Sequence, residues 1–286
     1  MNAEATSARE PALEDLLRAW GLRHTPFAEI DKHPAEIFAS PSQHEALPLL
    51  DTTAALRGVM LLTGPPGCGK STLLKSWIHS LEPKRYLPLL ITQSSLSAAG
   101  VLEMILAKLG ESPRFKRSAN LLALEAHLAQ LDSLTLVLVL DDAQNYPAPA
   151  LEEIRLLLGL GAARRNAFAL VLLGDQYLLG SLRLSVQRAL FSRISAAHQL
   201  APLPPDLLAD YLRWHLSRAG LDRDVFQPAA IDLLAEAAEG NPRTLNLLAQ
   251  AAWLAAARQQ AQEVLPQHVH LSLRQVPSVA AKIPAP

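Results

Sequence analysis

The sequence has a single cysteine and almost no net charge. Cys68 is the one cysteine among 286 residues, which excludes an internal disulfide and indicates a reducing compartment such as the cytoplasm. Because 26 Lys and Arg stand against 27 Asp and Glu, the formal net charge is −1. A protein that binds nucleic acid through overall positive charge is therefore excluded, and any contact with DNA needs a local basic patch.

Long apolar runs and a leader peptide are lacking as well. The longest candidate for a membrane span, residues 134–140, is far shorter than the roughly 20 residues that a spanning helix needs. The first residues, MNAEATSAREPALEDLL, are acidic and have no apolar centre, unlike a signal peptide. Half of the residues are hydrophobic and 19% are charged, which is typical of a soluble globular protein. We expect a cytoplasmic protein that does not contact a membrane.

Short apolar segments alternate with helical patterns over the first two thirds of the chain. Buried strands are expected at 58–64, 86–92, 134–142 and 168–175, with a fifth within 195–203. Apolar residues recur at helical spacing at 71–81, 99–110, 121–131 and 150–161. This alternation predicts an α/β fold, a doubly wound parallel sheet with helices on both faces.

The pattern changes after the prolines at 202, 204 and 205. No strand pattern follows, and three helical segments are expected, the first with Asp206 as its N-cap and the others starting at Pro228 and Pro242. The sequence therefore predicts a small all-helical domain after the sheet domain. The expected division is a helical or flexible N-terminal segment (1–19), the sheet domain (20–203), the helical domain (204–275) and a disordered tail (276–286).

One stretch of the chain, GPPGCGKST, is unusually poor in side chains. It follows the first expected strand and precedes a helix, which is the context of a phosphate-binding loop. Backbone N–H groups of such a loop surround phosphate oxygens, helped by the dipole of the following helix. A plain Gly/Pro-rich connection is the alternative. The residues expected to bind the nucleotide are Gly64, Pro65, Pro66, Gly67, Cys68, Gly69, Lys70, Ser71 and Thr72.

Two acidic residues follow the third expected strand, in LVLVLDDAQN. An apolar strand that ends in an acidic pair is typical of a Walker B site. Asp141 is expected to hold Mg²⁺ through water, with Ser71 as a further ligand, while Lys70 neutralises the β- and γ-phosphates of ATP. Asp142 stands where a glutamate usually polarises the attacking water. The alternative is an ordinary turn at a strand end, because Asp and Asn favour turns.

These motifs, in this order, resemble the AAA+ ATPases, and more narrowly their ExeA-like group. The resemblance extends from Trp20 to about Leu273. It is carried by WGLRHTPF (20–27), FASPSQHEAL (38–47), GPPGCGKST (64–72), LVLDDAQN (138–145), LLGDQYLLGSL (172–182), RALFSRI (188–194) and EGNPRTLNLL (239–248). It implies a P-loop NTPase fold whose helical domain acts as a lid, and an enzyme that binds and hydrolyses ATP with Mg²⁺.

The resemblance also implies roles for residues outside the two motifs. Arg243 matches the sensor-2 arginine that reaches the γ-phosphate. Arg193 and Arg188 match the region that presents an arginine finger to the nucleotide of a neighbouring subunit, so a homo-oligomer, as a ring or a filament, is implied. A surface ion pair is the alternative for either arginine. Phe27 is a candidate for the adenine pocket, with plain core packing as its alternative.

Two positions depart from the family pattern. Asp142 is one methylene shorter than the usual glutamate, and because small misplacements cost large rate factors, slow hydrolysis is expected. After the fourth expected strand, either Asp175 or Gln176 stands where sensor 1 usually has Asn, Ser or Thr. The sequence leaves that choice open.

The resemblance leaves three functions open. The first is an ATP-dependent DNA-binding regulator of transposition of the MuB/TnsC type, with duplex DNA and a transposase as partners. The second is a secretion- or pilus-associated ATPase, and the third a nucleotide-dependent scaffold. Because no membrane segment or cell-wall-binding domain follows the helical domain, transposition is the preferred expectation. In related transposition ATPases the loop after the second strand faces DNA, which makes Arg114, Lys116 and Arg117 candidate DNA-binding residues; a solvated loop is the alternative.

Overall fold

The computed structural model describes residues 12–28, 37–131, 133–160, 166–184 and 187–280, which form two compact units. The sheet unit comprises residues 33–201, and the helical unit comprises residues 1–32 together with 202–286. The second stretch of the helical unit begins at Pro202, and the helical domain was expected from residue 204. Trp20 to Ala28, which were expected in the sheet domain, group with the helical unit.

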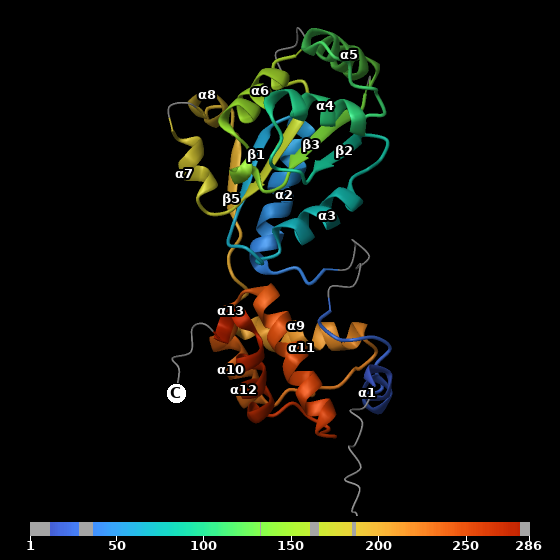
Figure 1. Ribbon diagram of the computed structural model, residues 1–286, viewed down its shortest axis with the longest axis vertical. Helices are drawn as coiled ribbons and strands as arrows, with labels where there is room; N and C mark the ends of the chain where they lie inside the picture. Colours follow the sequence, from blue (N-terminus) through green and yellow to red (C-terminus); the bar gives the residue numbers. More distant parts are fainter. Residues whose placement is uncertain (1–11, 29–36, 132, 161–165, 185–186, 281–286) are drawn as a thin grey trace, which may run out of the picture. The chain divides into compact units, whose positions relative to one another are not determined.

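The sheet unit is built on five parallel strands in the order β2-β3-β4-β1-β5 (Figure 1). All five predicted strands are confirmed, and β4 lies between the strand that precedes the phosphate loop and the strand that precedes the acidic pair. The carboxyl ends of β3, β4 and β1 therefore lie side by side at the same end of the sheet. The strands are β1 Val59–Thr63, β2 Tyr86–Ile91, β3 Thr135–Leu140, β4 Ala169–Gly174 and β5 Ala196–Gln199.

Helices cover both faces of the sheet, as predicted. Alternate strand residues point to opposite faces, so that Val59 and Leu61 belong to one core while Met60 and Leu62 belong to the other. Side chains of α4, α5 and α6 complete the first core, and those of α2 and α3 complete the second. The helices are α2 Pro41–Leu56, α3 Lys70–Ser80, α4 Ala98–Lys108, α5 Arg117–Gln130, α6 Ala148–Leu158, α7 Leu178–Leu182 and α8 Arg188–Phe191.

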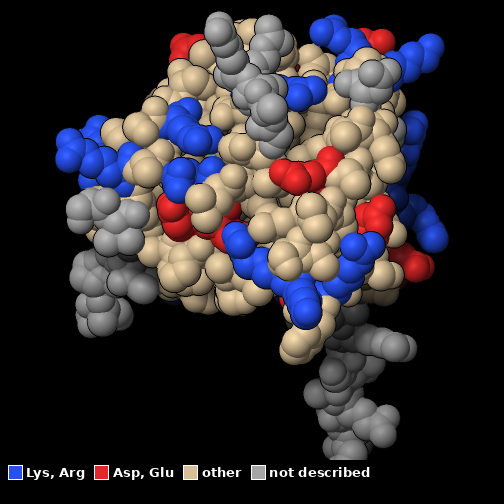
Figure 2. Space-filling model, turned by 90° about the horizontal axis from the view of Figure 1, so that it is seen from above, with Lys and Arg blue, Asp and Glu red and all other residues tan. Residues whose placement is uncertain are grey.

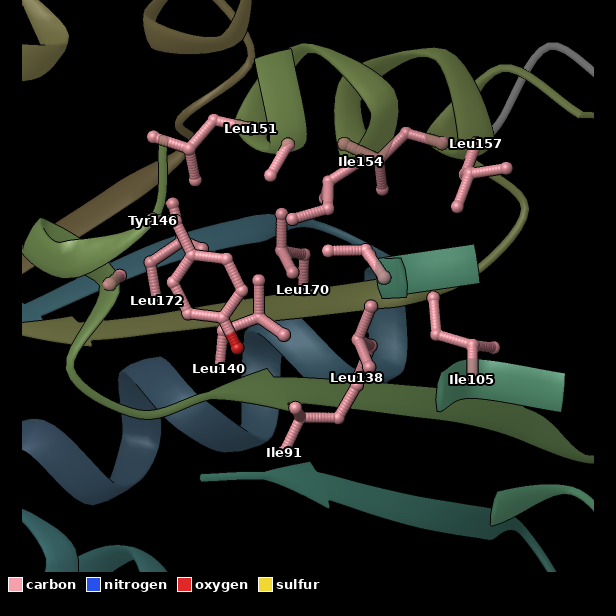
Figure 3. Packing of buried hydrophobic residues seen from close by; sticks show 14 of the residues in the cluster. Ile91, Ile105, Leu138, Leu140, Tyr146, Leu151, Ile154, Leu157, Leu170 and Leu172 are labelled. Atoms are coloured by element: carbon pink, nitrogen blue, oxygen red, sulfur yellow. The ribbon is translucent and has the colours of Figure 1, made fainter. Parts of the chain in front are cut away.

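The first of these cores is a continuous layer of branched side chains between α6 and the sheet. Figure 3 shows Leu151, Ile154 and Leu157 of α6 above Leu138 and Leu170 of the strands. All five are at most 2% exposed, and each contributes about 2 kcal/mol through burial. This layer holds the carboxyl ends of β3 and β4, and hence the residues that follow them, in fixed positions.

Helix α2 was not anticipated as a helix from the sequence. It begins with a capping box in which the backbone N–H of Gln43 donates to Ser40 Oγ at 3.4 Å and the Ser40 N–H donates to Gln43 Oε1 at 3.0 Å. Pro41 occupies the first helical position, where its missing N–H costs nothing. Leu50 and Ala54 are fully buried against the sheet.

The helical unit joins both ends of the chain in one core. Trp20 of α1 meets the fully buried Trp253 of α11 edge-on, with ring centroids 6.2 Å apart. The Arg23 N–H donates to Ala219 O at 2.8 Å, which ties the residues after α1 to the end of α9. The helices are α1 Leu13–Trp20, α9 Leu208–Arg218, α10 Pro228–Ala238, α11 Pro242–Arg258, α12 Pro266–Gln275 and α13 Pro277–Ala280.

Two local predictions for the helical unit were wrong. Asp206 is no N-cap, because it lies within a 3-10 turn, Pro205–Leu207, that precedes α9. The expected disordered tail includes α13, and Val276 and Val279 are buried at 6% and 5% exposure. The rest of that tail, 281–286, lies outside the described residues. The starts at Pro228 and Pro242 are confirmed.

Within the described part of the chain, no helix combines the length and the apolar character that crossing a bilayer requires.

Candidate nucleotide-binding site

The phosphate loop connects β1 directly to α3, as the sequence predicts. Two of its glycines are required by geometry. Gly69, the N-cap of α3, has φ of 96°, and a Cβ there would lie 3.0 Å from Gln43 Nε2. A Cβ on Gly64 would lie 2.8 Å from Cys68 Sγ and 3.2 Å from Leu200 O. The loop is therefore packed closely against the start of α2 on one side and the residue after β5 on the other.

The side chain of Lys70 folds back onto the phosphate loop. Its Nζ donates to Gly64 O at 2.8 Å and to Pro65 O at 3.1 Å, and it lies 4.0 Å from Cys68 Sγ. The ammonium is half-buried, so its desolvation is offset by these carbonyl contacts. The loop thus holds a positive charge beside the amino end of α3, where a phosphate is also favoured by the helix dipole.

Ser71 and Asp141 are brought together by the fold. Ser71 Oγ, in the first turn of α3, donates to Asp141 Oδ2 at 3.0 Å across a separation of 70 residues. A hydroxyl and a carboxylate beside a phosphate site are the ligand types that Mg²⁺ uses, together with water and phosphate oxygens. Among the described residues, no group of three or more His, Cys, Asp or Glu forms a metal cage. The two side chains fit a magnesium ion that a nucleotide brings with it.

Asp142 is exposed and has an unusual backbone conformation. Its φ is 50° and its ψ 45°, in the left-handed region that few non-glycine residues occupy, although Asp tolerates it better than most. Its N–H donates to Asp141 Oδ1 at 3.0 Å, and its Oδ1 accepts from Gln144 Nε2 at 3.2 Å. The left-handed turn directs successive carboxylates, Asp141 and Asp142, to different partners.

The side chain of Asp175 is engaged in a local turn. Its Oδ1 accepts from the N–H groups of Tyr177 at 2.9 Å and Leu178 at 3.1 Å, in the turn that precedes α7. Gln176 is exposed. The structure therefore leaves Gln176 as the freer of the two sensor-1 candidates, and its contact with nucleotide stays a prediction.

Gln144 is a site residue that sequence reasoning did not single out. It bonds to Asp142 through Nε2 and accepts the Asp175 N–H at 3.2 Å through Oε1. It thereby links the residues that follow β3 to those that follow β4. The available signal was its place in DDAQN, a motif that carried the family resemblance.

Tyr146 closes the turn after the acidic pair. Its ring lies within the first core (Figure 3), and its hydroxyl donates to Gln93 O at 2.9 Å. Burial, together with the negative charges of Asp141 and Asp142, raises its pKa to about 12. The phenol therefore stays protonated and keeps the turn tied to the residues after β2.

Two predicted site residues belong to the helical unit. Arg243 is exposed in the first turn of α11, where Asn241 Oδ1 accepts its N–H at 3.1 Å. Phe27 is 3% exposed with φ of 64°, and its ring lies 5.8 Å from that of Phe226 and 5.3 Å from that of His215. Phe27 is thus a core residue of the helical unit. The sensor-2 role of Arg243 and the adenine contact of Phe27 stay predictions.

The two candidate arginine fingers differ in their surroundings. Arg193 is half-buried, and its Nη1 donates to Asn166 Oδ1 at 3.5 Å. The pKa of Glu152 is lowered, mainly by its hydrogen bond from Arg155 and also by the charge of Arg193. Arg188 is exposed on the short helix α8. The contact with Asn166 uses one nitrogen of the Arg193 guanidinium. That Arg193 or Arg188 acts on the nucleotide of a neighbouring subunit stays a prediction.

The predicted DNA-contacting residues lie at the loop between α4 and α5. Phe115 is fully exposed, at 103%, and Arg114 and Lys116 beside it are exposed. The buried Asn120 fixes the loop, since its Oδ1 accepts the Arg114 N–H at 2.6 Å and its Nδ2 donates to Arg114 O at 2.9 Å. Figure 2, which views this end of the sheet unit, shows basic side chains in several separate groups with acidic ones between them.

Arg117, the third of these cations, has a structural partner. Its Nη2 donates to Glu153 Oε2 at 2.8 Å and Oε1 at 2.9 Å, and its Nε donates to Oε1 at 3.2 Å. The Glu153 side chain is 6% exposed and that of Arg117 is 50% exposed. Arg117 therefore neutralises a buried carboxylate of α6, which sets it apart from Arg114 and Lys116.

Comparison with known proteins identifies the fold. Residues 54–182 match the family model described as an AAA domain. The chain is 30% identical over 244 residues to General secretion pathway protein A of Aeromonas hydrophila, an alignment that covers 83% of this chain and 44% of that protein. The chain thus spans less than half the length of this relative.

Solved structures share the architecture at low sequence identity. The Aeropyrum pernix ORC2 protein, in ADPNP-ADP complexes, matches with a TM-score of 0.64 and 15% identity over 94% of this chain and 74% of that one. The Aeropyrum pernix ORC1 protein in complex with DNA matches with a TM-score of 0.63 and 18% identity over 89% and 71%. With the parallel sheet and its covering helices, these matches show the AAA+ P-loop NTPase fold.

Proposed function

Because the chain has the AAA+ P-loop NTPase fold, we propose that it binds ATP with Mg²⁺ and hydrolyses it slowly. The observation that carries this proposal is the 3.0 Å contact between Ser71 and Asp141, which brings the phosphate loop and the acidic pair into one site. Lys70 lies at the same loop and supplies the positive charge that phosphates need. The similar ORC2 protein was solved in ADPNP-ADP complexes, which supports a nucleotide at this fold.

The contacts of the site residues indicate what each does when the nucleotide binds. Lys70 exchanges the carbonyls of Gly64 and Pro65 for the β- and γ-phosphate oxygens. Ser71 and Asp141 would hold Mg²⁺, which would supply positive charge to the phosphates. Asp142 accepts a proton from the attacking water, and its short side chain makes turnover slow because reach and orientation limit such a step.

The remaining candidate residues are proposed to act on the same nucleotide chemistry. Arg243 is the proposed sensor of the γ-phosphate, and Arg193, with Arg188 as the second candidate, acts on the nucleotide of a neighbouring copy. The 3% exposure of Phe27 favours core packing over the adenine contact. The incomplete engagement of Arg193 by Asn166, at 3.5 Å, supports its availability. The working form is then a homo-oligomer in which one copy completes the site of the next.

A secretion-associated role is the context that the similar curated protein favours. The similarity to General secretion pathway protein A covers 83% of this chain. Because the chain spans 44% of that relative, its partners there belong to the proposal and not to the findings. Regulation of transposition, and a nucleotide-dependent scaffold, remain the alternative proposals.

Duplex DNA is proposed as a second ligand, because the exposed loop offers the chemistry for it. Arg114 and Lys116 flank the fully exposed Phe115, and cations there would contact phosphates with little sequence preference. The similar ORC1 protein was solved in complex with DNA, which is consistent with DNA binding by this fold. Each lost phosphate contact should lower the log–log salt slope of binding by about 0.9.

The magnesium-dependent part of ATP binding tests the proposed site. Titration of the wild-type chain with a fluorescent ATP analogue should give tighter binding in Mg²⁺ than in EDTA. Ser71→Ala should abolish this difference, because the hydroxyl ligand is lost, while binding in EDTA stays as in the wild type. A Ser71→Ala protein that retains the full magnesium effect would contradict the assignment. Ser80→Ala, on the same helix but at its far end, serves as the matched control.

DNA binding is tested separately with the Arg114→Ala/Lys116→Ala variant, in which Arg117 is kept. Binding to a duplex with a non-hydrolysable ATP analogue should be lost at low salt while ATP affinity is unchanged. Lys108→Ala, at the end of α4, removes one cation elsewhere and shows how much binding the loss of a single positive charge outside the loop costs. A wild-type protein that does not bind duplex DNA under these conditions would exclude the DNA proposal and leave the secretion context standing.

A further inference from the structure

Gln144 lies between the carboxyl ends of two strands, and both ends of its amide are bonded. Nε2 donates to Asp142 Oδ1 at 3.2 Å, and Oε1 accepts the backbone N–H of Asp175 at 3.2 Å. The first contact reaches the residue proposed as the base, and the second reaches the residue that follows β4. No other side-chain hydrogen bond to the Asp142 carboxylate is present among the described residues.

The orientation of this amide is fixed by its chemistry. A backbone N–H is only a donor, so the atom of Gln144 that faces Asp175 must be the acceptor Oε1. The donor Nε2 is then left to face Asp142, whose carboxylate is only an acceptor when ionised. Both contacts are satisfied by one orientation and lost in the flipped one. The Asp175 N–H therefore determines which end of Gln144 meets the carboxylate.

The surroundings leave room for the Gln144 amide and hold its backbone in place. A Cβ on Gly174 would lie 2.9 Å from Gln144 Oε1 and would collide with Leu178, so a glycine is needed there for space. On either side of Gln144, Ala143 is fully buried and Tyr146 is 4% exposed. The short helical turn that carries Gln144 is thus anchored in the core at both ends.

Asp142 itself has little else to hold its carboxylate. It is exposed, its backbone is in the left-handed region, and its carboxylate can rotate about the Cα–Cβ and Cβ–Cγ bonds. Within the described structure, one of its oxygens is bonded to Gln144, and the second is available to another hydrogen-bond donor. A donor on Oδ1 restricts the rotation of the group and so points Oδ2 in one direction.

We propose that Gln144 is a positioning residue for ATP hydrolysis, which holds Oδ1 of Asp142 so that Oδ2 accepts the hydrogen of the attacking water. The proposal rests on the proposed ATPase function and on Asp142 as its base. Gln144 touches neither water nor nucleotide in this role. The backbone N–H of Asp175, the residue after β4, sets the orientation of the Gln144 amide. The direction of the Asp142 carboxylate therefore depends on the position of β4, which lies between β1 and β3.

The decisive variant is Gln144→Glu. A glutamate keeps an acceptor for the Asp175 N–H but replaces the donor with an oxygen, so the contact with Asp142 becomes repulsive. Gln144→Ala, which removes both contacts without adding charge, covers the case in which the glutamate variant does not fold. Asn145→Ala is the matched control, because Asn145 is exposed in the same turn. Thermal unfolding followed by circular dichroism shows that each variant is folded.

Hydrolysis is measured as kcat, KM and a single-turnover rate, and ATP affinity by equilibrium titration. We expect Gln144→Glu and Gln144→Ala to lower kcat by about tenfold or more, since a small misdirection of a base has effects of this order. The ATP dissociation constant should stay within about twofold, and Asn145→Ala should behave as the wild type. A kcat that is unchanged in both Gln144 variants, or one that falls in step with ATP affinity, overturns the proposal.

An Asp142→Asn background separates positioning from a general structural effect. If Gln144 acts through Asp142, adding Gln144→Ala to Asp142→Asn should not lower the single-turnover rate further. An equal loss in both backgrounds would contradict the positioning role while the ATPase assignment stands. If Asp142→Asn alone hydrolyses ATP as fast as the wild type, the base is misassigned, and the proposal falls with it.

Discussion

Replacing Arg117 with alanine should destabilise the sheet unit, whatever its effect on DNA. The variant leaves the carboxylate of Glu153, 6% exposed, without the guanidinium that makes three contacts with it between 2.8 and 3.2 Å. Removing one partner of a fully buried pair costs about 3–5 kcal/mol. Because the Arg117 side chain is 50% exposed and water can replace part of it, we expect about 2 kcal/mol.

Urea unfolding followed by far-ultraviolet circular dichroism measures this cost. With a slope of about 2 kcal/mol per molar urea, the loss lowers the midpoint by about 1 M. Lys116→Ala is the matched control, because Lys116 is the exposed neighbour and should change the free energy of unfolding by less than about 0.5 kcal/mol. Equal midpoints for Arg117→Ala and the wild type would refute the reasoning that the pair stabilises this unit.

A second variant separates the lost ion pair from lost packing. Arg117→Leu alone leaves the carboxylate unpaired, whereas Arg117→Leu combined with Glu153→Leu leaves no charge behind. The double variant should therefore be the more stable of the two. The same pair explains why a DNA-binding test that also removes Arg117 would be ambiguous: reduced binding could follow from partial unfolding of α5 and α6 alone.

Three further predictions concern the nucleotide. Lys70→Ala should abolish ATP binding in a titration while the unfolding midpoint is kept; unchanged affinity would refute the phosphate-loop assignment. Asp142→Asn should trap bound ATP, and Asp142→Glu should raise turnover because the longer side chain reaches the attacking water. An unchanged steady-state ATPase rate in Asp142→Asn would exclude Asp142 as the base. Mixing Arg193→Ala with Lys70→Ala protein should recover activity, because some mixed interfaces contain one intact site, and no recovery at any ratio would count against action in trans.

The strands and the phosphate loop of the sheet unit were predictable because each depends on local pattern, whereas α2 was not anticipated. Uninterrupted apolar runs such as 134–142 are buried on both faces of a parallel sheet, and glycines at 64, 67 and 69 mark a loop that side chains would obstruct. Ser71 and Asp141 were both expected to hold Mg²⁺ because each stands in a recognisable motif, and their 3.0 Å contact agrees with that expectation. These parts of the site need no knowledge of distant contacts beyond the fold class.

What the sequence left hidden depends on contacts between distant residues. Arg117 was a candidate DNA ligand because its partner Glu153 lies 36 residues away, with nothing local to connect them. Trp20 was assigned to the sheet domain because its contact with Trp253 bridges nearly the whole chain. The second role of Gln144, accepting from Asp175, needed the order of the strands and not only the motif.

The preference for transposition over secretion was not supported by the comparisons. It rested on which domains follow the helical one, and the chain spans less than half of the similar secretion protein, so that argument does not distinguish the two. Gene neighbourhood or a partner captured in the ATP-bound state is the observation that decides between them.

The helical unit is made of two stretches of sequence, one before and one after the sheet unit. This order affects how the chain folds during synthesis. During translation, α1 with its apolar residues Leu16 and Trp20 leaves the ribosome before the sheet unit, but its partner α11 is made only after the whole sheet unit. The sheet unit can fold as soon as β5 is complete, whereas α1 must wait with its apolar face uncovered. Chaperones should therefore bind α1 on newly made chains. They should dissociate once α11 has been made and packs against α1.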